Sequence, residues 1–226
     1  RTLPASKGIK NVFVLRQPDH AVAIRNAARN AKSAIIIGGG YIGLEVAATF
    51  RKLGIAVSVI EVADRLLARV ASQPVADLLT DLHHSHGVFL YTGFGIEEIS
   101  HTDSVFSGVI LSDGTKLKGD MLVVGIGVTP DSDLAFQAGL ETEHASGGAI
   151  LVDECQQTSN PNIFSIGDVA LQRGSSIRIE SVNNAQDSAA RAAAAVMGKP
   201  RPGVQAPWFW SDQYDANLQS VGIVPT

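Results

Sequence analysis

Ala34-Ile35-Ile36-Ile37-Gly38-Gly39-Gly40-Tyr41-Ile42-Gly43 is the stretch that decides the fold of this 226-residue chain. Its apolar first half predicts a buried strand, and the three consecutive glycines predict a sharp turn. Residues 42–53 then have helical spacing and end at Gly54, which suits a left-handed helix cap. Another strand is predicted over 56–60. Strand, glycine turn, helix and strand in this order predict an α/β fold with a parallel sheet.

The glycines have the G-x-G-x-x-G spacing of a dinucleotide-binding turn. Gly38 permits the tight turn, Gly40 lets the backbone approach a pyrophosphate, and Gly43 lets helix and strand pack closely. Tyr41 and Ile42 lie between them, at the start of a helix whose N–H groups and positive dipole favour a phosphate. An ordinary tight turn explains glycines alone, but the strand before them and the helix after them favour a nucleotide site.

Glu61 stands 23 positions after Gly38, at the end of the second strand of this unit. An acidic side chain there can accept hydrogen bonds from the adenine-ribose hydroxyls of NAD, whereas it repels the 2′-phosphate of NADPH. The sequence therefore predicts NADH as the cofactor, although Arg65 and Arg69 are near enough in sequence to soften the discrimination. The alternative is a solvated glutamate at a strand end.

Two further carboxylates are candidate ligand groups. Glu45 follows the last motif glycine by two residues, so it is either a cofactor-side carboxylate or an acidic residue that stabilises a helix N-terminus. Asp168 follows the apolar run 163–166, which predicts a strand that would place this carboxylate at the carboxyl edge of a sheet. There it could bind a polyol chain, and the alternative is an ordinary Gly-Asp turn.

An aromatic cluster occupies residues 207–214. It holds both tryptophans, Trp208 and Trp210, and two more aromatic residues, in a chain that is only 6% aromatic. Such clustering is typical of a face against a planar ligand or a partner, and equally of a contact between domains.

The histidine and cysteine residues do not indicate a metal centre. His84 and His86 do not share a helix face, and no cysteine stands at a matching spacing. We expect His83, His84 and His86 to form a solvated helix end. Cys155 lacks a basic neighbour in sequence, so a nucleophilic role is not expected.

The composition excludes several classes of partner. A net charge of −4 and a pI near 5.8 give no basic face for nucleic acid or an anionic membrane. The longest apolar runs, such as 121–128, are far shorter than the ~20 residues that cross a bilayer. A single cysteine fits a reducing compartment. We therefore expect no nucleic-acid and no membrane partner, and a cytoplasmic setting.

The remaining segments continue the α/β pattern. Strands are expected over 12–15, 88–91, 105–111 and 121–125, helices over 18–31, 74–84 and 183–197, a hairpin turn at Asp113-Gly114, a domain boundary within 125–130, two short strands between 150 and 168, and a linker over 198–207.

With these segments in place, the chain resembles flavin-dependent pyridine-nucleotide oxidoreductases, in particular the NADH-dependent ferredoxin or rubredoxin reductases that supply electrons to oxygenases. The resemblance covers nearly the whole chain. It is carried by the segments 37–45, 66–70, 124–127, 166–168, 180–181 with 184–185, and 208–213. It implies a Rossmann-like parallel-sheet domain that binds NAD and part of a second α/β domain that binds FAD.

The resemblance also implies roles for residues around NAD. Glu45 would lie by the nicotinamide, with Gly125 and Gly127 bordering the same pocket. Glu61 would bind the adenosine ribose, and Arg69 would lie near the adenosine end.

Two further residues are implied for FAD. Asp168 would hydrogen-bond the ribityl chain, and Trp210 would lie near the flavin, on the side where electrons leave for an iron–sulfur partner.

The resemblance also implies a division into domains, from which the chain departs in one respect. It has one glycine fingerprint, whereas members of the family carry a second one for the ADP half of FAD. The chain also lacks an initiator methionine and ends in Val221-Gly222-Ile223-Val224-Pro225-Thr226, a strand-like run with a breaker, so we expect it to be cut from a longer protein. The implied parts are 1–8 as a linker or FAD-domain remnant, 9–126 as the NAD-binding domain, 127–203 as the second half of the FAD-binding domain, and 204–226 as the start of a C-terminal interface domain.

The expected function is therefore a reductase that passes electrons from NADH through FAD to a ferredoxin- or rubredoxin-type acceptor, impaired in a fragment. Two alternatives stay open. One is an enzyme of the disulfide-reductase branch, and the other is a non-catalytic module that binds NAD.

Overall fold

A computed structural model describes residues 3–223 of the chain. These residues form two compact units, which are described separately. The first comprises residues 3–127 together with 211–218, and the second comprises 128–210 together with 219–223.

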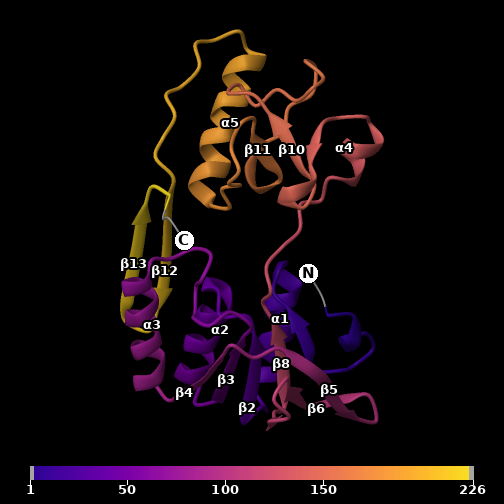
Figure 1. The fold of residues 1–226 in the computed structure, drawn as a ribbon, viewed down its shortest axis with the longest axis vertical. Helices are drawn as coiled ribbons and strands as arrows, with labels where there is room; N and C mark the ends of the chain where they lie inside the picture. Colours follow the sequence, from indigo (N-terminus) through magenta and orange to yellow (C-terminus); the bar gives the residue numbers. More distant parts are fainter. Residues whose placement is uncertain (1–2, 224–226) are drawn as a thin grey trace. The chain divides into compact units, whose positions relative to one another are not determined.

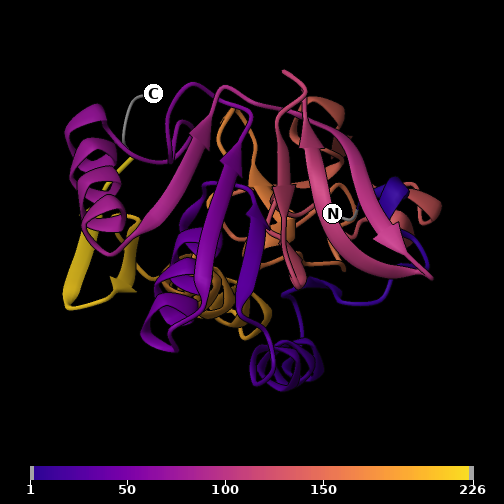
Figure 2. The ribbon, with the colours of Figure 1, turned by 90° about the horizontal axis from the view of Figure 1, so that it is seen from below.

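The first unit is built on a five-stranded sheet in which every neighbouring pair of strands is parallel. Figure 2 shows these strands side by side. Their order is β1 (Val12–Val14), β8 (Met121–Val124), β2 (Ser33–Ile37), β3 (Ala56–Glu61) and β4 (Val88–Thr92). The predicted α/β fold with a parallel sheet is confirmed, and Glu61 is the last residue of its strand as expected.

Each face of this sheet has its own cover, because successive side chains of a strand point to opposite faces. Ala34 and Ile36 pack into a core with the helices, whereas Ile35 and Ile37 pack into a second core with an antiparallel meander. The helices are α1 (Pro18–Ala28), α2 (Tyr41–Lys52) and α3 (Gln73–Ser85), and the meander is β5 (Ile96–Thr102), β6 (Val105–Leu111) and β7 (Lys116–Lys118).

The expected helices and strands of this unit form, with small shifts at their ends. The first helix ends at Ala28 instead of residue 31, because Arg29 is its cap and a turn follows. The meander adds β5 and β7, which the sequence did not separate from the strand over 105–111. A short 3-10 turn, η1 (Pro4–Ser6), precedes β1.

The second unit is smaller and contains a three-stranded sheet of short strands. Its order is β11 (Ala170–Gln172), β10 (Ala149–Val152) and β9 (Thr142–Glu143), with β10 parallel to β11 and antiparallel to β9. The helices are α4 (Asp133–Gln137) and α5 (Val182–Val196), and the 3-10 turns are η2 (His144–Ser146) and η3 (Gly167–Val169). Figure 1 shows α5 beside β10 and β11.

The strand expected over 163–166 is wrong. Phe164 makes one isolated bridge, to Gln157, and the adjacent amide of Ser165 donates to the Gln156 carbonyl at 3.0 Å. These bonds close a local loop, so the apolar run pairs with the segment just before it and not with a sheet. Asp168 consequently precedes a strand, β11, and does not end one.

The aromatic segment forms a hairpin of β12 (Trp208–Gln213) and β13 (Ala216–Val221). Its residues 211–218 belong to the first unit, where Leu218 packs against the core on the helix side of the parallel sheet. Residues 198–207 contain no helix or strand, as a linker requires. The final strand-like run was expected to extend to Thr226, and residues 224–226 lie outside the described part of the chain.

Candidate dinucleotide site

Three strands of the first unit end at one edge of the parallel sheet. Ile37 of β2 is in register with Ile60 of β3 and with Val124 of β8. The backbone continues this alignment past the strand ends, because the amide of Gly38 donates to the Ile60 carbonyl at 2.8 Å and the amide of Gly125 to the Ile37 carbonyl at 2.7 Å. The carboxyl edge of a parallel sheet is where α/β proteins bind ligands.

The three motif glycines serve different purposes at this edge. Gly38 has φ +109°, and a Cβ there would lie 2.4 Å from the Gly125 carbonyl oxygen. A Cβ at Gly43 would lie 2.1 Å from the Gly38 carbonyl oxygen. A Cβ at Gly40 would meet no atom within 4 Å, so this glycine faces open space. Gly38 and Gly43 are therefore needed for packing, and Gly40 leaves its backbone open to a ligand.

The start of α2 fits a phosphate group. Gly40 is the N-cap residue, and no side chain caps the helix there. Tyr41 and Ile42 form its first turn, with Ile42 half exposed and burial raising the pKa of the Tyr41 hydroxyl. An uncapped helix N-terminus beside an open glycine offers N–H groups and a positive dipole to a pyrophosphate.

Glu61 supports the glycine turn directly. One carboxylate oxygen accepts from the Gly39 amide at 2.7 Å, and the other accepts from the Ala63 amide at 2.9 Å. Glu61 is therefore partly buried and hydrogen-bonded to the backbone, and its binding of a ribose stays a prediction. A carboxylate can accept about four hydrogen bonds, so the same side chain keeps capacity for a pair of ribose hydroxyls.

A loop over residues 62–71 closes on the glycine turn. The Leu67 amide donates to the Gly39 carbonyl at 3.0 Å, and a Cβ at Gly39 would lie 2.6 Å from Leu66 Cδ2. The guanidinium of Arg65 holds this loop by donating to three backbone carbonyls, those of Leu66, Ala68 and Ala71. The Arg65 guanidinium is thus hydrogen-bonded within the protein, and these N–H groups are not free to bind a 2′-phosphate.

Arg69, in contrast, is exposed. Its Nη2 lies 3.7 Å from the Cβ position of Gly127, the residue with φ +86° that follows the end of β8. A Cβ at Gly125 would lie 3.7 Å from the Gly43 backbone, so the residue after β8 is in contact with α2. The structure therefore brings Arg69, Gly125 and Gly127 to the edge that carries the glycine turn.

Glu45 lies in the first turns of α2 and contacts the hairpin. Its Oε1 accepts from the Ser211 hydroxyl at 2.5 Å. Exposed and buried side chains alternate along β12, and this alternation turns Ser211 and Gln213 inward, each 1% exposed. Polar residues at the inward positions of a strand were the available sign of this contact, and the sequence reasoning missed it.

His83 departs from the expected solvated helix end. Its side chain is 0% exposed and hydrogen-bonded to Gln213, whereas His84 and His86 are exposed as expected. The expectation for His83 failed because its cover is supplied by the hairpin, 130 residues later in the chain. Among residues 3–223 no group of three histidine, cysteine or carboxylate side chains is placed to hold a metal.

The two residues implied for FAD are exposed. Asp168 lies in η3, where its carbonyl accepts from the Arg178 guanidinium. Trp210 is 38% exposed and stacks on Trp208, with ring centroids 5.1 Å apart.

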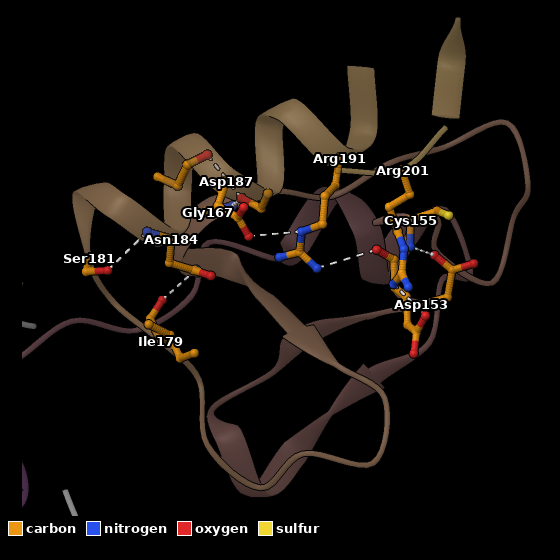
Figure 3. A network of polar contacts seen from close by, with 12 residues as sticks. Asp153, Cys155, Gly167, Ile179, Ser181, Asn184, Asp187, Arg191 and Arg201 are labelled. Carbon is orange, nitrogen blue, oxygen red and sulfur yellow. Dashed lines mark hydrogen bonds and ion pairs between the residues drawn. The ribbon is translucent and has the colours of Figure 1, made fainter. Parts of the chain in front are cut away.

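A polar network supports α5 and the turn before β11 in the second unit (Figure 3). Ser181 caps the helix by accepting from the Asn184 amide at 3.1 Å, and the Gly167 amide donates to the Ser188 hydroxyl at 3.0 Å. Arg191 pairs with Asp187 at 3.1 Å. The network fixes the backbone next to Asp168, through the amide of Gly167. In the part of the chain that is described, no helix is both long and apolar enough to cross a membrane.

Known proteins match this chain over almost all of its length. The model of the family "Pyridine nucleotide-disulphide oxidoreductase" matches residues 1–189. The 5,5′-dehydrodivanillate O-demethylase ferredoxin reductase subunit of Sphingobium sp. is 41% identical, over 95% of this chain and 52% of its own. Putidaredoxin reductase of Pseudomonas putida is 38% identical, over 99% of this chain and 54% of its own.

A solved structure gives the same result. The crystal structure of a ferredoxin reductase from Rhodopseudomonas palustris has a TM-score of 0.92 and 40% identity, and the match covers 99% of this chain and 55% of that one. The chain thus spans about half the length of the relatives that it matches.

Proposed function

We propose that the first unit of this chain binds NADH for a ferredoxin-reducing flavoprotein. The premise is that the chain belongs to the pyridine nucleotide-disulphide oxidoreductase family, whose model matches residues 1–189. The observation that carries the proposal is the sheet edge at which an open Gly40, an uncapped helix start and the Glu61 carboxylate occur together. These features match the pyrophosphate and the adenosine ribose of a dinucleotide.

The residues would divide the cofactor between them as follows. The backbone at Gly38, Gly40 and Gly43, with the helix start at Tyr41 and Ile42, would hold the pyrophosphate. Glu61 would bind the adenosine ribose, and Arg69 would supply positive charge from beside Gly127. The nicotinamide would lie by Gly125, Gly127 and Glu45.

The second unit would hold part of FAD. We assign 9–126 to the NAD-binding domain, 127–203 to the second half of an FAD-binding domain and 204–226 to the start of an interface domain, with 1–8 as a linker or remnant. Asp168 would bind the ribityl chain and Trp210 would lie near the flavin. NADH and FAD supply the redox chemistry when bound, so the chain itself binds, orients and shields them. The electron acceptor would be a ferredoxin- or rubredoxin-type protein, in the cytoplasm.

Isothermal titration calorimetry of the purified chain with NADH and with NADPH tests the proposal. We expect NADH to bind more tightly, because the Glu61 carboxylate repels a 2′-phosphate. Glu61→Gln keeps the side-chain length and one acceptor oxygen but removes the charge. It should reduce the preference for NADH by roughly fivefold or more, since a charge pair near a protein surface is worth about 1–4 kcal/mol at 4 Å.

Asp103→Asn is the matched control, because it removes one charge from the turn before β6, next to the Lys10 backbone and away from the carboxyl edge. It should leave the preference unchanged. A wild-type chain that binds neither nucleotide, or binds NADPH as tightly as NADH, would contradict the proposed function.

A further inference from the structure

A buried chain of hydrogen bonds runs from the α3 end of the first unit to Glu45. It has four links. Tyr214 OH contacts His83 Nδ1 at 3.2 Å, His83 Nε2 contacts Gln213 Oε1 at 2.8 Å, Gln213 Nε2 contacts Ser211 Oγ at 3.1 Å, and Ser211 Oγ contacts Glu45 Oε1 at 2.5 Å. The three middle residues are at most 1% exposed.

The donors and acceptors of this series of hydrogen bonds can be arranged in only one direction. Gln213 Oε1 is an acceptor, so His83 Nε2 must carry the imidazole proton, and His83 Nδ1 then accepts from the Tyr214 hydroxyl. The Gln213 amide donates onward to Ser211, which leaves the serine proton to donate to Glu45. Every donor therefore points towards the carboxylate, and each link determines the orientation of the next.

The surroundings keep both donors at the far end in the required protonation state. Burial lowers the pKa of His83, and the nearby His86 and His84 lower it further against the opposing hydrogen bond to Gln213. Burial raises the pKa of Tyr214 to about 12, against the charge of Arg51. At neutral pH the imidazole is therefore neutral and the phenol is protonated, as the direction of the chain requires.

The series of hydrogen bonds ends on only one oxygen of the Glu45 carboxylate. Oε1 accepts from Ser211, and no group of the described residues donates to Oε2. Glu45 is already ordered by Ser211, and its Oε2 can accept from an amide N–H₂ group. Binding such a donor therefore does not require the Glu45 side chain to become ordered.

We propose that Ser211 is a positioning residue, which Gln213 and His83 orient, and which aims the Glu45 carboxylate at the carboxamide of the nicotinamide ring. This inference rests on the proposed function, since it deepens the role of Glu45 in NADH binding. It adds residues from a strand that follows the glycine turn by more than 160 positions.

Two nucleotides separate a positioning role from a merely structural one. NADH carries the carboxamide, whereas ADP-ribose shares the pyrophosphate and adenosine and lacks it. Ser211→Ala should weaken NADH binding by roughly three- to tenfold, the range for one lost hydrogen bond, and leave ADP-ribose binding within about twofold. Ser211→Thr keeps the hydroxyl and should restore NADH affinity. Urea unfolding of each variant shows that the fold is intact.

A double-mutant cycle tests whether Ser211 acts through Glu45. In a Glu45→Gln background, Ser211→Ala should have little further effect on NADH affinity. Independent, additive effects would overturn the inference, as would equal weakening of NADH and ADP-ribose, or no weakening of either.

Nuclear magnetic resonance of the chain without nucleotide keeps the test separate from the proposed function. Wild-type His83 should show the nitrogen shifts of a neutral ring protonated at Nε2, and Ser211→Ala should move the carboxyl carbon resonance of Glu45. A chain that binds no NADH refutes the proposed function, and these spectra then decide the positioning role. The opposite tautomer, or an unmoved Glu45 resonance, overturns it.

Discussion

At the scale of single residues, glycines of one motif are under different constraints. Gly43 is fixed by backbone, because its Cβ position lies 2.1 Å from the Gly38 carbonyl oxygen, and a backbone atom cannot rotate away. Gly40 has φ −80° and open space around its Cβ position, so an alanine there meets no obstacle within the protein. The same substitution at the two positions should therefore act on different properties.

We expect Gly43→Ala to destabilise the fold and Gly40→Ala to weaken NADH binding. The clash at Gly43 should lower the free energy of unfolding by about 1–3 kcal/mol, as overpacking does. The methyl group at Gly40 should leave unfolding nearly unchanged but occupy the approach of the pyrophosphate. Urea unfolding and nucleotide titration of both variants measure the two effects. Equal stability losses would contradict the division of roles.

His83 gives a prediction on pH, because its folded pKa is lowered from the ordinary value of 6.5. Well above pH 6.5 the ring is neutral in both states and adds no pH dependence. As the pH falls below that value, His83 becomes protonated in the unfolded chain but stays neutral in the folded chain. The free energy of unfolding therefore decreases until the pH reaches the folded pKa of His83. The slope contributed by one such group is at most about 1.4 kcal/mol per pH unit.

His83→Gln should therefore flatten the dependence of unfolding free energy on pH below 6.5. His84→Gln is the control, because His84 is exposed on the same helix and its replacement should keep the wild-type slope. Urea unfolding at several pH values gives the slopes. A His83→Gln slope as steep as that of the wild type would show that another group is responsible.

At the scale of elements, two segments without regular sheet partners stabilise the site. The loop over 62–71 lies on Gly39 and is tied by the three carbonyl bonds of Arg65. The β12–β13 turn is tied to the helices by Lys52, which donates to the Tyr214 carbonyl at 2.7 Å, and by stacking of Tyr214 on His86. In both segments the contacts are made by long side chains, which hydrogen-bond to backbone carbonyls or stack on a ring.

These segments also mark the limit of prediction from sequence. The glycine turn, its strands and the position of Glu61 follow from local pattern, because neighbouring residues determine a turn, a helix start and a strand. Arg65 appeared free to meet a phosphate because the carbonyls that receive it are not visible in sequence. His83 appeared solvated because its cover comes from Gln213 and Tyr214. The run 163–166 was assigned as a strand because apolar content does not reveal its pairing partner.

At the scale of the whole molecule, the two units have separate cores. The core on the helix side of the first unit contains Ile36, Leu44 and Val59, whereas that of the second unit contains Ala135, Leu140 and Ile150. A ligand that binds only the folded first unit stabilises that unit by mass action, by about 2.7 kcal/mol at a hundred times its dissociation constant. The second unit would gain nothing from a site that the first unit forms alone.

We therefore expect NADH to slow amide hydrogen exchange in the first unit and not in the second. Peptides that cover α2 and β3 should exchange more slowly with saturating NADH, because their opening requires release of the nucleotide. Peptides from α5 should exchange at the same rate with and without it, and they serve as the internal control. In Gly40→Ala, at the same NADH concentration, the protection of α2 should be reduced in proportion to the weaker binding. Protection of α5 equal to that of α2 would show that the nucleotide site extends into the second unit, and the assignment of NADH to the first unit alone would then be wrong.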